Sequence, residues 1–166
     1  MFSYYQLSVP VYARALQQLA HLLDKGADFA LSKKVSDETM LGLRLAPDML
    51  PLVKQVQIAC DNAKFCVARL SDTTAPKHDD NEKTFAELKK RIDETISFIN
   101  SVPESAFANA AGKTIVLPFM PDKPMSAEFY LLSFLTPNFY FHLTTAYDLL
   151  RSNGVEIGKA DYIGEV

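Results

Sequence analysis

The sequence predicts an all-α protein built as a four-helix bundle, and two observations carry this prediction. Apolar residues recur every three or four positions in four separate stretches, which is the spacing of amphipathic helices. A short β-branched run at 114–117 stands between the third and fourth stretches, so we expect an extended or hairpin segment in that crossover. A single domain spanning 1–166 is expected, because 48% hydrophobic residues in a chain of 166 suit one sizeable core.

The net charge of the protein and the length of its apolar runs limit the kinds of partner that it can bind. The net charge is -3, whereas binding to nucleic acid or an anionic membrane normally shows as clustered Lys and Arg. The cluster Lys89-Lys90-Arg91 is interpreted as part of a solvated helix face. No apolar run is long enough to span a bilayer, and the segment 1–10 lacks a secretory pattern. We therefore expect a cytoplasmic protein with no nucleic-acid or membrane partner.

The first two helices have recognisable starts. Ser8 followed by Pro10 indicates the beginning of the first helix, which should run to about 31–34. Ser36 is expected to cap a short helical turn, and Asp48 to cap the second helix. The apolar stripes of the two helices are Tyr12, Leu16, Leu19, Leu23 and Ala27, and then Leu52, Val56, Ala59, Ala63, Val67 and Leu70.

The second helix also carries polar and sulfur-containing side chains. Gln57 and Asp61 are four residues apart and therefore share one helix face. They either look into the protein or belong to a solvated face, and the sequence leaves both possibilities open. Cys60 and Cys66 point to different sides of the helix, so we interpret them as buried thiols rather than a disulfide or a zinc site.

Residues 71–83 are predicted to form a loop, because turn formers and charges replace the apolar period. His78, within this loop, is expected to be solvated. Thr84 and Glu87 have the spacing of a capping box and should open the third helix, which ends before Pro103.

The fourth helix, predicted over 126–154, carries the most informative polar residues. Asn138 and His142 lie one turn apart with Thr145 just beyond, and apolar neighbours flank this line. Buried polar groups need partners, so either the fold or a ligand must satisfy them. Pro137 should kink the helix one turn before His142.

This helix is apolar nearly all round, so it must be covered on both sides by its own domain or by a second subunit. We expect a homodimer that uses the aromatic side chains of the helix, with the first helix contributing. These side chains are Phe129, Tyr130, Phe134, Tyr140, Phe141 and Tyr147.

Several segments together resemble an uncharacterised domain-of-unknown-function branch of the DinB/YfiT-like superfamily. The segments are Leu-Ala-Pro-Asp-Met at 45–49, Gln-Val-Gln-Ile-Ala-Cys-Asp at 55–61, Pro-Asn-Phe-Tyr-Phe-His at 137–142 through Ala146-Tyr147, and Asn-Gly-Val at 153–155 with Gly158-Lys159. The resemblance covers essentially the whole chain. It implies an up-down-down-up four-helix bundle that is commonly dimeric.

The resemblance also implies a place for a metal. Many DinB-like proteins bind a divalent metal through three histidines, one on the second helix and two spaced by four on the fourth. Here only His142 matches, Asn138 stands at the other position on the fourth helix, and the second-helix position falls at Gln57 or Ile58. Amides are poor ligands for zinc or nickel, so we expect no metal and no other cofactor.

Two functions follow from these residues. We favour a binding module that holds a small ligand in a polar-lined cavity between the second and fourth helices, formed by Gln57, Asp61, Asn138, His142 and Thr145. The alternative is a DinB-like metal-dependent enzyme, of the thiol-dependent transferase or hydrolase type, with a degenerate zinc or nickel site. A second form of the enzyme alternative uses His142 as a general base oriented by Asp61. The sequence names neither a ligand nor a reaction.

Overall fold

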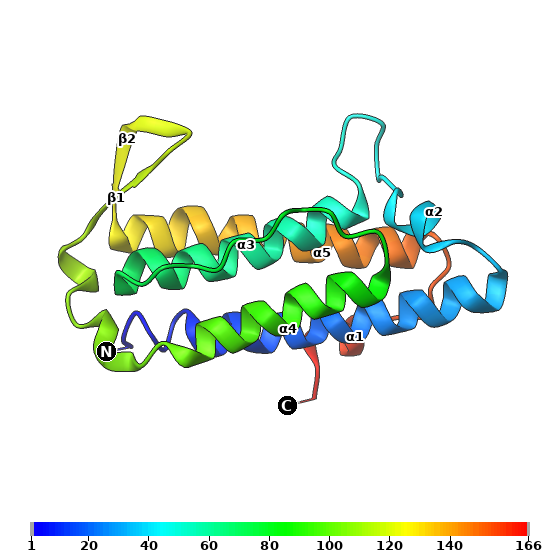
Figure 1. The fold of residues 1–166 in the computed structure, drawn as a ribbon, viewed down its shortest axis with the longest axis horizontal. Helices are drawn as coiled ribbons and strands as arrows, with labels where there is room; N and C mark the ends of the chain where they lie inside the picture. Colours follow the sequence, from blue (N-terminus) through cyan, green and yellow to red (C-terminus); the bar gives the residue numbers. More distant parts are fainter. Residues whose placement is uncertain (1, 166) are drawn as a thin grey trace.

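The protein is mostly helical, as predicted, with one small hairpin. A computed structural model describes residues 2–165, and within them four helices of 17 to 25 residues form the body: α1 (Val9–Lys33), α3 (Leu52–Ser71), α4 (Phe85–Ser101) and α5 (Thr136–Ser152). Figure 1 shows these helices side by side, with α1 and α5 running in one direction and α3 and α4 in the other.

The parallel direction of α3 and α4 gives their connection an unusual path. Residues 72–84 must return along the length of the bundle before α4 can begin, and Figure 1 shows this segment lying along the two helices. We call residues 72–84 the strap. The predicted loop is therefore a segment laid along the body of the protein.

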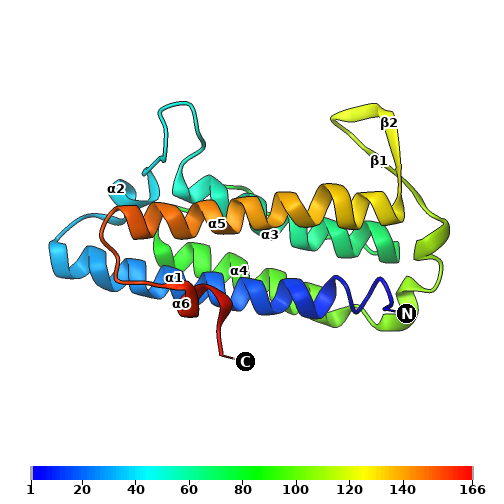
Figure 2. The same cartoon turned by 180° about the vertical axis from the view of Figure 1, so that it is seen from behind.

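Shorter elements join the long helices. They are α2 (Asp37–Leu41), the 3-10 helices η1 (Glu104–Phe107) and η2 (Ala110–Gly112), strands β1 (Thr114–Leu117) and β2 (Met120–Ser126), the π-helix η3 (Phe129–Leu135), and α6 (Lys159–Ile163). The strands pair antiparallel, with Ile115 opposite Met125, so the expected hairpin is confirmed. Figures 1 and 2 show the hairpin and the 42–51 loop rising from the same side of the bundle, at opposite ends.

Local sequence explains several helix ends. The Thr84 side chain accepts a hydrogen bond from the Glu87 N–H, and the Glu87 carboxylate accepts one from the Thr84 N–H, which is the predicted capping box. Ser36 caps α2 through the Thr39 N–H. The prediction for Asp48 is wrong, since α3 begins at Leu52 with Pro51 as the capping residue.

The predicted fourth helix differs in detail. It consists of the π-helical η3 followed directly by α5, and Pro137 lies in the first turn of α5. Proline has no N–H to donate, so a change of hydrogen-bonding pattern just before it fits its chemistry. Thr136, at this junction, shares a 2.8 Å hydrogen bond with the Tyr12 hydroxyl of α1, which ties the junction to the core.

The core lies between the four long helices, and α3 packs closely on both α5 and α4. Helix α1 also approaches its neighbours closely at Gly26. A Cβ atom added there would lie 2.9 Å from Leu150 Cδ2 and 3.1 Å from a ring atom of Phe85. Within the described residues, no helix has the length and apolar character required to cross a membrane.

Candidate functional site

Helix α3 carries polar side chains on two faces, and this separates the residues predicted to share one site. Gln55 and Asn62 are seven residues apart and both bond to side chains of α5. Gln57 and Asp61 lie on a different face, and their side chains bond to the strap and α4. The structure therefore shows two polar groups. We call the first the α3–α5 seam and the second the strap cluster.

His142 is the buried centre of the α3–α5 seam. Its Nδ1 lies 2.7 Å from Oε1 of Gln55, and the amide Nε2 of Gln55 donates to the Leu50 carbonyl at 2.9 Å. Because the Gln55 amide is oriented by Leu50, its oxygen faces the ring and His142 Nδ1 must be the donor. The resemblance implies Gln57 or Ile58 as the second-helix metal position, whereas the α3 residue that contacts His142 is Gln55.

Burial lowers the pKa of His142 below its ordinary value, because the charged imidazolium would lose its hydration. The ring is therefore neutral at pH 7. With its proton on Nδ1, the neutral ring keeps a lone pair on Nε2, and no hydrogen bond to Nε2 is formed within residues 2–165. Asp61 bonds Arg91 and Lys64 instead of His142, so the suggested His142–Asp61 dyad does not form.

The second contact of the seam joins two asparagines. Nδ2 of Asn138 donates to Oδ1 of Asn62 at 3.3 Å. Nδ2 of Asn62 is itself buried and has no hydrogen-bond partner within residues 2–165. An unpaired buried donor costs about 1–3 kcal/mol, so this amide is the least satisfied group of the seam.

Thr145 lies on the same side of α5 as His142 but is already satisfied. Its hydroxyl donates to the carbonyl of Phe141 at 2.7 Å, one turn earlier in the helix. It can offer a ligand only the lone pairs of its oxygen.

The strap cluster is organised by Arg91, which is 2% exposed. Its Nη1 donates to Asp80 at 2.6 Å and to Glu82 at 2.9 Å, and its Nη2 donates to Asp61 at 2.8 Å. Gln57 donates to the second oxygen of Glu82 at 2.7 Å. The interpretation of Arg91 as a solvated residue is therefore wrong, because it holds the strap against α3 and α4.

Lys64 and His78 complete this cluster. Lys64 is buried and lies 2.8 Å from Asp61 and 3.0 Å from Nδ1 of His78. An ammonium group can only donate, so His78 Nδ1 accepts and the ring is neutral. Burial, then the positive charges of Lys64 and Arg91, lower the pKa of His78. The expected solvated position is wrong, since the His78 side chain is only 8% exposed.

The residues of the seam do not fit the three-histidine metal site that the resemblance implies. His142 is the one imidazole there, and its neighbours Gln55, Asn62 and Asn138 are amides, which bind transition metals poorly. Among residues 2–165, no group of three or more His, Cys, Asp or Glu side chains is arranged to hold a metal ion.

Cys60 and Cys66 are free and fully buried, as the sequence indicates. Burial raises the pKa of each thiol to about 12, which leaves both protonated at neutral pH. Neither has the exposed, electropositive setting of a reactive cysteine.

Comparison with known proteins identifies the class. The chain matches the family described as "Domain of unknown function (DUF1993)" over residues 4–163, and it belongs to that family. It is also similar to the crystal structure of a DinB family member protein from Shewanella denitrificans. The two share 45% sequence identity with a TM-score of 0.93, over 98% of this chain and 92% of that chain. Comparison with curated proteins gives no match.

Proposed function

We propose that this DUF1993 protein is a small-molecule binding module and that its site is the α3–α5 seam. The unpartnered Nδ2 of Asn62 carries this proposal, because a buried donor without an acceptor suits a ligand that supplies one. His142 Nε2 offers an acceptor on the neighbouring turn of α5 from Asn138. A ligand with one hydrogen-bond acceptor and one donor would satisfy both groups.

The aromatic residues of this face support the same proposal. Phe141, beside His142, is 54% exposed, and Phe65 of α3 is 37% exposed. The Phe141 ring meets the His142 ring edge to face at 5.2 Å. Ligand sites commonly combine apolar and aromatic walls with a few polar groups that fix orientation, and the seam offers this combination.

The substitution Asn62→Leu tests the proposal. It removes the unpaired donor but also the oxygen that accepts from Asn138 at 3.3 Å, so the melting temperature should change little. The substitution should abolish stabilisation by any small molecule that stabilises the wild-type protein. Asn100→Leu, at an exposed position of α4, is the matched control and should keep that response. A compound that stabilises the wild type and Asn62→Leu equally would show that binding occurs elsewhere.

We also propose a homodimer of up-down-down-up bundles, in the cytoplasm. The exposed apolar side chains near the hairpin and on α3, η3 and α5 support this assembly: Phe65, Val116, Phe119, Phe129, Leu132 and Phe141. Exposed apolar side chains that form a patch favour association. Tyr130 cannot contribute as the sequence suggested, because it is fully buried in its own chain beneath Arg69. The two free thiols are compatible with a reducing compartment.

A further inference from the structure

The strap is held to the body of the protein by charge and hydrogen bonds. Within residues 72–84, all of which the structure describes, no apolar side chain is buried. Its closest attachments are the contacts of Asp80 and Glu82 with Arg91, of Glu82 with Gln57, and of His78 with Lys64. Further ion pairs join Asp72 to Lys113, Asp80 to Lys54 and His78 to Glu94. A segment held this way can be exchanged for another group that offers the same charges, because little apolar surface is lost.

The surface beneath the strap is rich in hydrogen-bond donors. Gln57, Lys64 and Arg91 are each 2% exposed, and among them they carry two positive charges. Asp61 of α3 supplies one carboxylate, which lies 2.8 Å from Lys64 and 2.8 Å from Arg91. Arg91 Nε, moreover, is buried and has no partner within the described chain. The strap provides the remaining acceptors, so this surface binds carboxylates.

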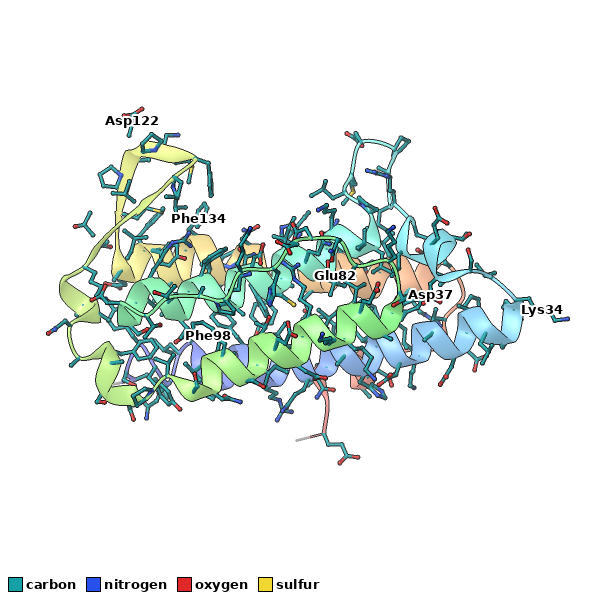
Figure 3. The ribbon with its side chains drawn as sticks, in the orientation of Figure 1. Lys34, Asp37, Glu82, Phe98, Asp122 and Phe134 are labelled. Atoms are coloured by element: carbon teal, nitrogen blue, oxygen red, sulfur yellow. The ribbon has the colours of Figure 1, made fainter. Side chains whose placement is uncertain are left out.

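Glu82 occupies this surface in the manner of a bound ligand. One carboxylate oxygen accepts from Gln57 Nε2 at 2.7 Å and the other from Arg91 Nη1 at 2.9 Å, and the side chain is 10% exposed. Burial acts to raise the pKa of Glu82, but the hydrogen bonds from Arg91 and Gln57 outweigh it and lower the pKa. Figure 3 labels Glu82 where the strap approaches the start of α4.

A cavity of about 450 Å³ lies next to residue Glu82. Its wall contains Glu82 itself, the apolar Leu41 and Val53, and the charged Glu38 and Lys83. This volume lies within the range of small-molecule sites. A molecule in the cavity would therefore have its hydrocarbon part against Leu41 and Val53 and its polar end next to the Glu82 position.

We propose that Gln57 and Arg91 form a carboxylate-binding site occupied by Glu82 as a built-in ligand, and that a short-chain monocarboxylic acid displaces Glu82 from it. The exchange replaces one carboxylate by another on Arg91, so the buried guanidinium never loses its partner. The apolar Leu41 and Val53 in the cavity wall suit a hydrocarbon tail, which favours monocarboxylates over dicarboxylates. Displacement frees the end of the strap next to Lys83.

Butyrate is the probe, compared with chloride at equal ionic strength and pH 7.5. In the wild-type protein, butyrate should shift the Gln57 side-chain amide signals in a ¹⁵N NMR spectrum and speed trypsin cleavage after Lys83. In Glu82→Ala the built-in ligand is gone, so butyrate should bind about tenfold more tightly and raise the melting temperature more than chloride does. Glu82→Gln serves the same purpose if Glu82→Ala does not fold.

Asp79→Ala is the matched control, since Asp79 is an exposed strap carboxylate that contacts only Lys77 as an ion pair among the described residues. Its response to butyrate should equal that of the wild type. The proposal is overturned if butyrate and chloride act alike on the Glu82 variants, or if Asp79→Ala gains as much affinity as they do. The proposed function at the α3–α5 seam would be unaffected by either result, because Asn62 and His142 take no part in the test.

Discussion

Nδ1 of His142 on α5 donates to Oε1 of Gln55 on α3 at 2.7 Å, and Gln55 is in turn held by the carbonyl of Leu50. This chain of two hydrogen bonds fixes which nitrogen of His142 carries the proton. It also fixes where the lone pair of the ring is available. The position of His142 is thus set by its own helix, by α3, and by Leu50, which lies just before α3 in the sequence.

The first prediction concerns this contact. His142→Ala should lower the free energy of unfolding by about 1–3 kcal/mol, because it leaves the buried oxygen of Gln55 without a donor. Urea unfolding at pH 7.5 measures the change. His21→Ala, at a histidine whose side chain is 47% exposed, is the control and should have a smaller effect. Equal losses in the two variants would argue against a structural role for the Gln55 contact.

The second prediction concerns acid. The pKa values of His78 and His142 are lowered in the folded protein, so below about pH 6.5, the ordinary histidine pKa, the unfolded chain binds more protons than the folded one. Stability should therefore be full above that pH and fall as the pH drops through it. Urea unfolding at pH 7.5 and 5.5 measures how much the free energy of unfolding falls between the two pH values. This fall should be smaller in a His78→Gln, His142→Gln double variant. An unchanged fall in that variant would assign the acid sensitivity to other groups.

The third prediction concerns the strap. Arg91→Met should cost about 3 kcal/mol in the free energy of unfolding, because it leaves the Glu82 carboxylate without its cation and removes the closest cation of Asp80. Asp61 also loses the guanidinium and keeps only Lys64. Its sequence neighbour Lys90 is 78% exposed, and Lys90→Met should change stability by less than about 0.5 kcal/mol. Chemical denaturation of both variants measures the difference, and equal costs would contradict the role given to Arg91.

The fourth prediction concerns assembly. Light scattering at micromolar concentration should give the mass of a dimer for the wild type and of a monomer for Phe141→Glu, which places a charge among the exposed apolar side chains. Asn100→Glu, on an exposed position of α4, should remain dimeric. A monomeric wild type would remove the basis for the proposed assembly.

Periodicity and capping predicted much of the fold. The stripes of α1 and α4, the Thr84–Glu87 capping box and the hairpin all depend on local sequence, which a pattern can report. Helix α3 shows where this reasoning fails. Gln55, Gln57, Asn62 and Lys64 are all buried, so the apolar stripe does not single out one inner face. The pairing of Gln55 with His142 depends on the rotation of α3 against α5, which is set by tertiary packing.

The strap illustrates a second limit of sequence patterns. Its composition is that of a solvated loop, which is why His78 is expected in solvent. Arg91 is expected in solvent for another reason, because it follows Lys89 and Lys90 in a basic cluster. The length of the connection could have indicated its path. Two consecutive parallel helices require a connector that is long enough to return along the bundle. Such a connector can cover charged residues of the helices and bury them.

The most direct test of ligand binding at the α3–α5 seam is a native mass spectrum of gently purified protein. The proposal predicts a signal heavier than the polypeptide by the mass of a small organic molecule, present in the wild type and in Asn100→Leu and lost in Asn62→Leu. Binding at the seam would be contradicted if the adduct is retained in Asn62→Leu. It would also be contradicted if the wild type shows only the mass of the polypeptide and no small molecule stabilises it. An adduct with the mass of zinc or nickel that is lost in His142→Ala would instead restore the metal-dependent alternative.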